Sequence, residues 1–434
     1  MLRSSCCSEL KHFRRLHTSA AAPRVWSRPR LLPRRPVNAL KDSKPQFAAG
    51  YASSEIPVVR PPIGRAVLYF GTVALLSFSG CAAWSVFKTE KIVQQSAKQN
   101  WTSMGSFFID QYDTRRLKDA ERDAQLSSLH RRLIQLRRSL AVLPAVVQEP
   151  IIRAALSLAE WYVELPSYKQ AAIPVIAINT GVFALWMLAP RLRFSLFMQR
   201  HFTARPASGR VYTMLTSVFS HKAPAHFLFN NLALWSVGAS SLTVLASRKA
   251  WNSDVITIPD VIPGPHFFAF FVTAGTFASL VSHLVTALRW RATSSILKQA
   301  TRSVPRASQR LRADLNATIR LANIVLSKLA QRASLGSSGA IYAAFVLSAL
   351  TYPQATLSLI FLPFTAIPIQ WGMSGLILLD IIGIVRGWRL FDHFAHIGGA
   401  LFGLVYYAYG GAFWNIAKQQ VAKFRQETSR PQFA

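Results

Sequence analysis

Residues 336–345 read GSSGAIYAAF, a nearly uncharged stretch that opens on two glycines and two serines. A segment dense in arginine precedes it, and it leads into an apolar run that is fit to lie in lipid. A helix about to enter a membrane therefore begins with a small, backbone-permissive corner that carries a free hydroxyl. The residues around this corner, and those that alternation brings beside it, indicate what it is for.

The composition of the chain is that of a membrane protein. Of its 434 residues, 51% are hydrophobic and 12% are aromatic, which does not suit a soluble globular protein of this size. Lysine and arginine number 50 against 18 aspartates and glutamates, a formal net charge of +32. Such an excess is typical of nucleic-acid binding, contact with an anionic membrane, or an import signal. Because the basic residues lie between hydrophobic runs, we expect contact with membrane lipid and no nucleic-acid partner.

The N-terminus has the composition of an import leader. Residues 1–50 are rich in arginine and serine, only Glu9 and Asp42 are acidic, and no apolar segment of secretory length occurs. This pattern predicts a mitochondrial or plastid transit peptide. The alternative is a disordered basic tail on the cytosolic face of another membrane. We assign residues 1–60 to a mitochondrial transit peptide or disordered basic leader, outside the fold.

Seven apolar segments are candidates for membrane spans, since a helix needs about 20 apolar residues to cross the hydrocarbon core. They are residues 66–87, 171–190, 224–246, 266–288, 336–352, about 369–385, and 391–411. Pro363 and Pro368 indicate an irregular or re-entrant loop before the sixth segment.

The fold class that follows is an all-α polytopic membrane protein, with a six-helix core preceded by one extra transmembrane helix. The extra helix is residues 66–87, and residues 88–170 form an extramembrane amphipathic helical region. The core is residues 171–411, and residues 412–434 are a basic C-terminal tail.

Loop charge predicts the orientation of the spans. Loops 191–223 and 289–335 and the turn after residue 385 are strongly basic, whereas 247–265 is balanced and 353–367 is uncharged. Alternation puts the basic loops and the N-terminus on one side, which is the matrix for a protein imported into mitochondria. The pattern offers no role for the long basic loop 289–332.

Three polar clusters lie at the positive-side ends of their helices. They begin at His226 in the third span, at Gly336 in the fifth, and at Ala395 in the seventh. Polar and ionisable groups at membrane depth are costly, which makes them candidates for function. Because these three helices enter from the same face, alternation brings the clusters to one depth.

The chemistry that fits the clusters is a nucleophile with a base. A serine hydroxyl becomes a good nucleophile when an imidazole takes its proton, and Ser338 and His396 supply that pair. His226 and Asn230 stand one helical turn apart and can point into one pocket as donors to an oxyanion. The Ser338 backbone N–H, at a helix start, adds a third donor.

Small residues and one aromatic residue support the predicted pair. Gly399 and Gly403 form a G-x-x-x-G face on which another helix can approach closely, and Gly339 on the facing helix helps in the same way. Gly336 opens the serine corner. Tyr342 lies one turn below the serine, where it can stack on the predicted base.

Each cluster also has a structural interpretation. Gly/Ser pairs at membrane-helix starts are more often packing devices, and a single intramembrane histidine is more often a hydrogen-bonded packing residue. We interpret Asp380 as structural, satisfied near Arg386 or Arg389, with a proton relay as the alternative. No aspartate is expected to orient His396, so packing against Tyr342 has to do that.

Metal chemistry is not indicated. The histidines at 221, 226, 393 and 396 include no H-E-x-x-H motif and no carboxylate that completes a zinc set. Cys6, Cys7 and Cys81 have neither disulfide nor metal-binding spacing. We therefore expect no metal and no other cofactor.

The motifs HFLFN at 226–230, GSSG at 336–339 with Tyr342, and AHIGG at 395–399 with Gly403 resemble those of the rhomboid family of intramembrane serine proteases. The likeness covers residues 171–411. The extra span behind a transit-like leader resembles the mitochondrial, presenilin-associated branch.

The resemblance implies Ser338 as nucleophile, His396 as base, and His226 and Asn230 as oxyanion-hole donors, without metal or ATP. It implies a multi-pass protein of the mitochondrial inner membrane with its N-terminus on the matrix side. Its partners would be transmembrane protein substrates, of the inner-membrane dynamin-like GTPase class and the presequence-bearing class. The alternatives are a catalytically silent rhomboid-like scaffold or chaperone for membrane helices and, less favoured, a proton-coupled transporter around Asp380.

Overall fold

The computed structural model describes residues 59–100, 114–247, 258, 260–304, 308–359 and 362–429. The chain divides into two units, Met1–Glu55 and Ile56–Ala434. All described residues belong to the second unit. The predicted leader, residues 1–60, lies outside the described residues except for its last two positions.

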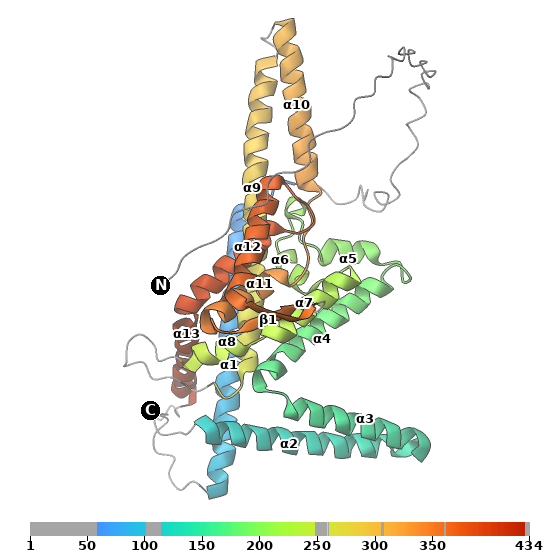
Figure 1. Cartoon of the computed structure of the whole chain (residues 1–434), viewed down its shortest axis with the longest axis vertical. Coiled ribbons are helices and arrows are strands. Elements are labelled where there is room, and N and C mark those ends of the chain that lie inside the picture. The colour runs from blue at the N-terminus through green and yellow to red at the C-terminus, as the bar shows by residue number, and fades with distance from the viewer. Residues whose placement is uncertain are drawn as a thin grey trace, which may run out of the picture. The chain divides into compact units, whose positions relative to one another are not determined.

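Helices make up most of the described chain (Figure 1). The extra N-terminal helix is α1 (Ile63–Asn100), and the amphipathic region contains α2 (Thr114–Ser139), η3 (Leu140–Val142) and α3 (Ala145–Glu164). The core helices are α4 (Ser167–Leu188), α7 (Pro224–Val237), α8 (Ser240–Ser247), α9 (Pro263–Ser303), α11 (Ser338–Thr351), α12 (Ile369–Arg386) and α13 (His393–Ser429). Between α4 and α7 lie α5 (Ser195–His201), η4 (Pro206–Ser208), α6 (Thr213–Thr216) and η5 (Ser217–Phe219).

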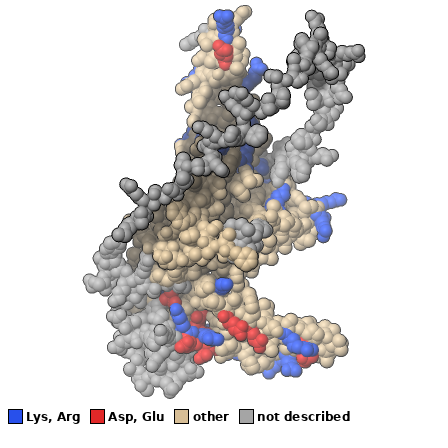
Figure 2. Space-filling view, viewed as in Figure 1, with Lys and Arg blue, Asp and Glu red and all other residues tan. Residues whose placement is uncertain are grey.

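The predicted all-α polytopic class is confirmed. Each of the seven predicted segments contains helix, and four of the described helices are long and apolar enough to cross a membrane: α1, α4, α9 and α12. Helix α11 is apolar but shorter, and it packs between α9 and α13, so protein rather than lipid covers its sides. On the face shown in Figure 2, acidic side chains gather toward α2 and α3, and the tip of α9 and α10 is mainly basic.

The third predicted span, 224–246, is two helices rather than one. Gly238, with φ +40°, ends α7, and α8 starts at Ser240. A positive φ is strained for residues with a side chain, and glycine adopts it readily.

Two predicted loops are more ordered than expected. The apolar loop before α12 contains an antiparallel hairpin of β1 (Thr356–Leu359) and β2 (Leu362–Pro368), which is a correction to the irregular loop we expected. Backbone pairing satisfies the polar groups of an apolar segment, and a two-stranded ribbon has free edges that tolerate proline. The basic loop 289–332 is largely helical, because α9 continues to Ser303 and α10 (Gln309–Ala330) returns along it (Figure 1).

The hydrophobic core surrounds α9. Phe267, Phe270 and Phe271 of α9 are fully buried together with Leu347 of α11 and Trp414 of α13. A helix that is apolar on all sides needs other helices or lipid to cover it, and here helices cover much of α9. Helix α1 packs along both α9 and α13, which makes the extra N-terminal helix part of this core.

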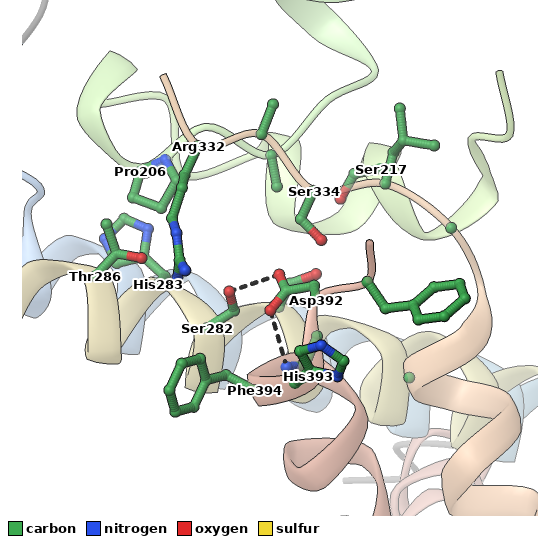
Figure 3. A pocket seen from close by; sticks show the side chains of 18 of the residues that line it. Pro206, Ser217, Ser282, His283, Thr286, Arg332, Ser334, Asp392, His393 and Phe394 are labelled. Carbon is green, nitrogen blue, oxygen red and sulfur yellow. Dashed lines mark hydrogen bonds between the residues drawn. The ribbon is translucent and has the colours of Figure 1, made fainter. Parts of the chain in front are cut away.

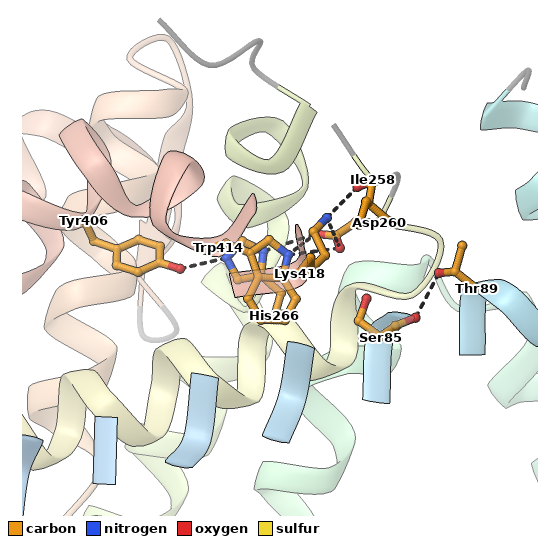
Figure 4. Close-up of polar contacts among 8 residues, drawn as sticks. All are labelled: Ser85, Thr89, Ile258, Asp260, His266, Tyr406, Trp414 and Lys418. Atoms are coloured by element: carbon orange, nitrogen blue, oxygen red, sulfur yellow. Dashed lines mark hydrogen bonds and ion pairs between the residues drawn. The ribbon is translucent and has the colours of Figure 1, made fainter. Parts of the chain in front are cut away.

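A buried polar cluster joins the start of α9 to the C-terminal half of α13 (Figure 4). Lys418 Nζ lies 3.0 Å from Asp260 Oδ1, Trp414 Nε1 donates to Asp260 Oδ2 at 2.8 Å, and His266 bonds the Tyr406 hydroxyl at 2.7 Å. Burial by itself raises the pKa of the Asp260 carboxyl, but Lys418 and His266 outweigh it and lower that pKa to about 2. The buried charges of Asp260 and Lys418 are therefore paired, as stability requires. Trp414 and Lys418 belong to the predicted C-terminal tail, which is helical as far as Ser429.

Candidate active site

The predicted nucleophile and base are in hydrogen-bond contact. Ser338 is the first residue of α11, His396 lies in the first turn of α13, and Ser338 Oγ is 2.8 Å from His396 Nε2. Ser338 is half-buried and His396 is buried. A hydroxyl at this distance from a neutral ring nitrogen can pass its proton to the imidazole.

The glycine corner before α11 aims the serine. Gly336 has φ +123°, and a Cβ on it would lie 2.6 Å from Cε1 of the His226 ring. Its N–H donates to the Ser217 carbonyl at 2.9 Å, and a backbone bridge joins Ser334 to Ala204. Only glycine fits this conformation in this space, so the corner fixes where α11 begins.

Close packing of α11 on α13 brings the two residues together. A Cβ on Gly399 would overlap the carbonyl oxygen of Gly339, and a Cβ on Gly403 would overlap that of Ala343. The two backbones are therefore in direct contact along the G-x-x-x-G face. Small residues permit this approach, as in other membrane helix pairs.

Two groups orient the His396 ring. Tyr342 stacks on it, with ring centroids 4.4 Å apart and an interplanar angle of 15°. The Asp380 carboxylate of α12 is hydrogen-bonded to the other ring nitrogen, with His396 Nδ1 3.0 Å from Oδ1 and 3.2 Å from Oδ2. The expectation that no aspartate orients this imidazole was therefore wrong.

The position of Asp380 follows from the rotation of α12. Ile369, Met373, Asp380 and Gly383 are its buried residues and share one face of the helix. Arg386 is exposed and, within the described residues, forms no ion pair with Asp380, and the same holds for Arg389. A carboxylate at helical spacing from other buried positions, followed by two histidines three residues apart in the next helix, was the available signal in the sequence.

A second histidine shares this carboxylate. His393 Nδ1 is 2.6 Å from Asp380 Oδ1, and the His393 ring covers Gly383, where a Cβ would overlap it. Asp380 therefore joins α12 to the start of α13 through two imidazoles.

The two predicted oxyanion donors line the same cavity as Ser338 and His396. Asn230 Nδ2 donates to the His226 carbonyl at 2.8 Å, and its Oδ1 accepts from Ser337 Oγ at 3.3 Å. The amide is thus held beside the serine corner.

Behind these residues lies His221, fully buried, with Nε2 3.1 Å from Ser337 Oγ. Burial, and then the nearby His226, lower the pKa of His221 to about 3, so that it stays neutral at physiological pH.

The cavity around the pair has a volume of about 1540 Å³. Figure 3 shows part of its wall, where Asp392, Ser282 and Arg332 face one another. Basic side chains in the wall are Arg205, Arg210, Arg289, Lys328, Arg332 and Arg389, and among the described residues that line it Asp392 is the one carboxylate. Among the residues that the structure describes, no group of three or more His, Cys, Asp or Glu could hold a metal ion.

Comparison with known proteins places these residues in a family context. Residues 310–413 match the family described as Rhomboid domain. The presenilin-associated rhomboid-like protein, mitochondrial, of Homo sapiens is 29% identical over 253 residues, covering 58% of this chain and 51% of that protein. Presenilin-associated rhomboid-like protein A, mitochondrial, of Danio rerio is 26% identical over 281 residues, covering 64% of this chain and 58% of that protein.

A more distant relative agrees. Rhomboid protein 1, mitochondrial, of Saccharomyces cerevisiae is 23% identical over 249 residues, covering 55% of this chain and 52% of that protein. The chain spans about half the length of the curated relatives it matches. No solved structure matches the chain. The resemblance drawn from the three motifs is thereby confirmed.

Proposed function

Because this chain carries a rhomboid domain and is similar to mitochondrial presenilin-associated rhomboid-like proteins, we propose that it is an intramembrane serine endopeptidase. It cleaves transmembrane segments of inner-membrane or presequence-bearing mitochondrial proteins with Ser338 and His396 as its catalytic pair. The observation that carries the proposal is the 2.8 Å contact between Ser338 Oγ and His396 Nε2 inside a cavity. A scaffold that only binds membrane helices has no need of this contact.

The reaction follows the logic of acyl transfer. Ser338 Oγ attacks the scissile carbonyl while His396 Nε2 takes its proton, and the imidazolium then protonates the leaving amine. Asp380 keeps the other proton on His396 Nδ1, which leaves Nε2 free to accept. Water hydrolyses the acyl-enzyme by the same steps in reverse.

The developing oxyanion is stabilised by donors that are already in place. Ser338 begins α11, so its backbone N–H belongs to the first turn, where N–H groups lack intrahelical partners. Asn230 and His226 line the cavity beside it. Donors fixed before the reaction contribute more than donors that must reorganise.

The substrate is a transmembrane segment that partly unwinds into the cavity. An unwound backbone in lipid has no hydrogen-bond partners, whereas the polar cavity wall supplies them.

The three basic loops share one side, which for an imported inner-membrane protein is the matrix, and the N-terminus lies on that side.

The test is labelling of the purified, reconstituted chain with a fluorophosphonate, which reacts with activated serines. We expect labelling of the native chain and none of Ser338→Ala or His396→Ala. Ser348→Ala is the matched control, because Ser348 lies on the same helix and bonds Ser241 instead. Labelling that persists in Ser338→Ala, or its absence from a folded native chain, would refute the proposal and favour the scaffold.

A further inference from the structure

Two arginines lie at the two ends of the basic loop 289–332, for which the sequence indicates no role. Arg289 lies on α9 just beyond the predicted span, and Arg332 follows the end of α10. The helical hairpin returns the chain, so that both line the catalytic cavity. Figure 3 shows Arg332 pointing into it toward Ser282 and His283 of α9. Both side chains are exposed to solvent.

Neither guanidinium has an acidic partner within the described residues. Asp392, a carboxylate in the cavity wall, already accepts hydrogen bonds with both oxygens. Its Oδ2 accepts from Ser282 Oγ at 2.6 Å, and its Oδ1 accepts from the Ala395 N–H at 3.2 Å. It caps the start of α13. Two positive charges in one cavity, whose wall carries further basic side chains, attract an anion.

Each arginine lies beside an element that carries one residue of the catalytic pair. The Arg289 guanidinium carbon lies 4.8 Å from the centre of the Phe394 ring, two residues before His396. Arg332 precedes Ser334, whose backbone pairs with Ala204 at 2.8 and 2.9 Å. An anion bound by both arginines would therefore lie in the cavity that Ser338 also lines.

We propose that Arg289 and Arg332 form an anion-binding subsite of the catalytic cavity, which takes an aspartate or glutamate side chain of the substrate. In the substrate, this acidic residue lies on the side of the scissile bond that faces the basic loops. The planar guanidinium fork matches a carboxylate, which can accept two N–H bonds. A substrate side chain fits better than a lipid headgroup because the subsite shares its cavity with Ser338. The inference rests on the proposed peptidase function.

The experiment compares two transmembrane substrates that differ only in a flanking Glu or Gln, cleaved by the full chain in phosphatidylcholine vesicles. A hydrogen-bonded charge pair predicts a Glu preference of roughly 10- to 100-fold in kcat/KM. Arg289→Gln and Arg332→Gln should each lower this ratio, and the double variant should bring it to about one. Arg332→Glu should instead prefer a third substrate that carries Lys at the same flanking position. Arg302→Gln is the matched control, since Arg302 is exposed near the end of α9 and does not line the cavity.

Binding separates this inference from the peptidase proposal. Fluorescence anisotropy of the same two labelled substrates on Ser338→Ala should show the Glu preference without any cleavage. If neither the native chain nor any variant cleaves the substrates but the Glu preference in binding is present, the result supports the subsite and refutes the peptidase proposal. A native chain without a Glu preference overturns the subsite alone. Arginine variants that alter only the rate response to added phosphatidylglycerol, with an unchanged Glu/Gln ratio, overturn it in favour of a lipid headgroup site.

Discussion

Asp380→Asn is the most direct test of how His396 is held. The carboxylate lies 3.0 and 3.2 Å from His396 Nδ1 and is buried. Asparagine keeps the shape but removes the negative charge that stabilises the imidazolium, and its amide group can select the wrong tautomer. In a Ser-His-Asp triad this change costs about 10⁴ in kcat.

The expected loss here is smaller because Tyr342 still stacks on the ring. A hydrogen bond to a charged group contributes about 1.5–3 kcal/mol, so kcat should fall roughly 10- to 100-fold with KM little changed. The assay is cleavage of an internally quenched transmembrane substrate in proteoliposomes, with thermal unfolding as the check on folding.

Asp392→Asn is the matched control for this experiment. Asp392 lies before α13 and accepts from Ser282 Oγ with Oδ2 and from the Ala395 N–H with Oδ1. Asparagine keeps one oxygen that can accept from the Ala395 N–H, and its NH2 group can donate to the Ser282 hydroxyl. It should retain activity within about threefold. Equal rates in folded Asp380→Asn and the native chain, or equal losses in both variants, would show that the carboxylate does not act through His396.

Three further predictions concern the oxyanion site, the helix contact and a buried histidine. Asn230→Ala should lower kcat on the order of 10²–10³, so loss of less than fivefold would remove it from the oxyanion site. Gly399→Ala should lower the free energy of unfolding by about 1–3 kcal/mol, because its Cβ would overlap the Gly339 carbonyl, whereas Gly375→Ala has open space and should not; equal melting temperatures would contradict the close approach. His221 has a pKa lowered from 6.5 to about 3 in the folded chain, so the unfolded chain binds more protons and stability falls as pH drops below 6.5. Between pH 7.5 and 5.5 its contribution should fall by about 1.4 kcal/mol; denaturant unfolding of the native chain and His221→Gln at both pH values measures it, and identical pH dependence would exclude this role.

Much of the candidate site could be predicted because two simple rules act on it. Parity of the spans puts the starts of α11 and α13 on one side of the membrane, which brings Ser338 and His396 to one depth. A G-x-x-x-G face permits close helix contact wherever it occurs, and the contact of Gly399 with Gly339 fulfils it.

Asp380 could not be assigned by the same rules. A carboxylate in a membrane helix needs a partner, and Arg386, Arg389 and His396 were all near enough in the chain. Which of them it meets depends on the rotation of α12 about its own axis. Likewise, two prolines indicated an interrupted segment but did not distinguish an irregular loop from the β1–β2 hairpin, whose pairing joins residues on separate strands.

The sequence by itself determined that this is a polytopic helical membrane protein and which residues are candidates for its chemistry, since apolar length, loop charge and motif spacing act locally along the chain. The tertiary structure decided the partner of His396, the break at Gly238 and the presence of Arg289 and Arg332 in the wall of one cavity. These depend on how helices are rotated and spaced against one another, and that is set by packing over the whole bundle rather than by any one segment.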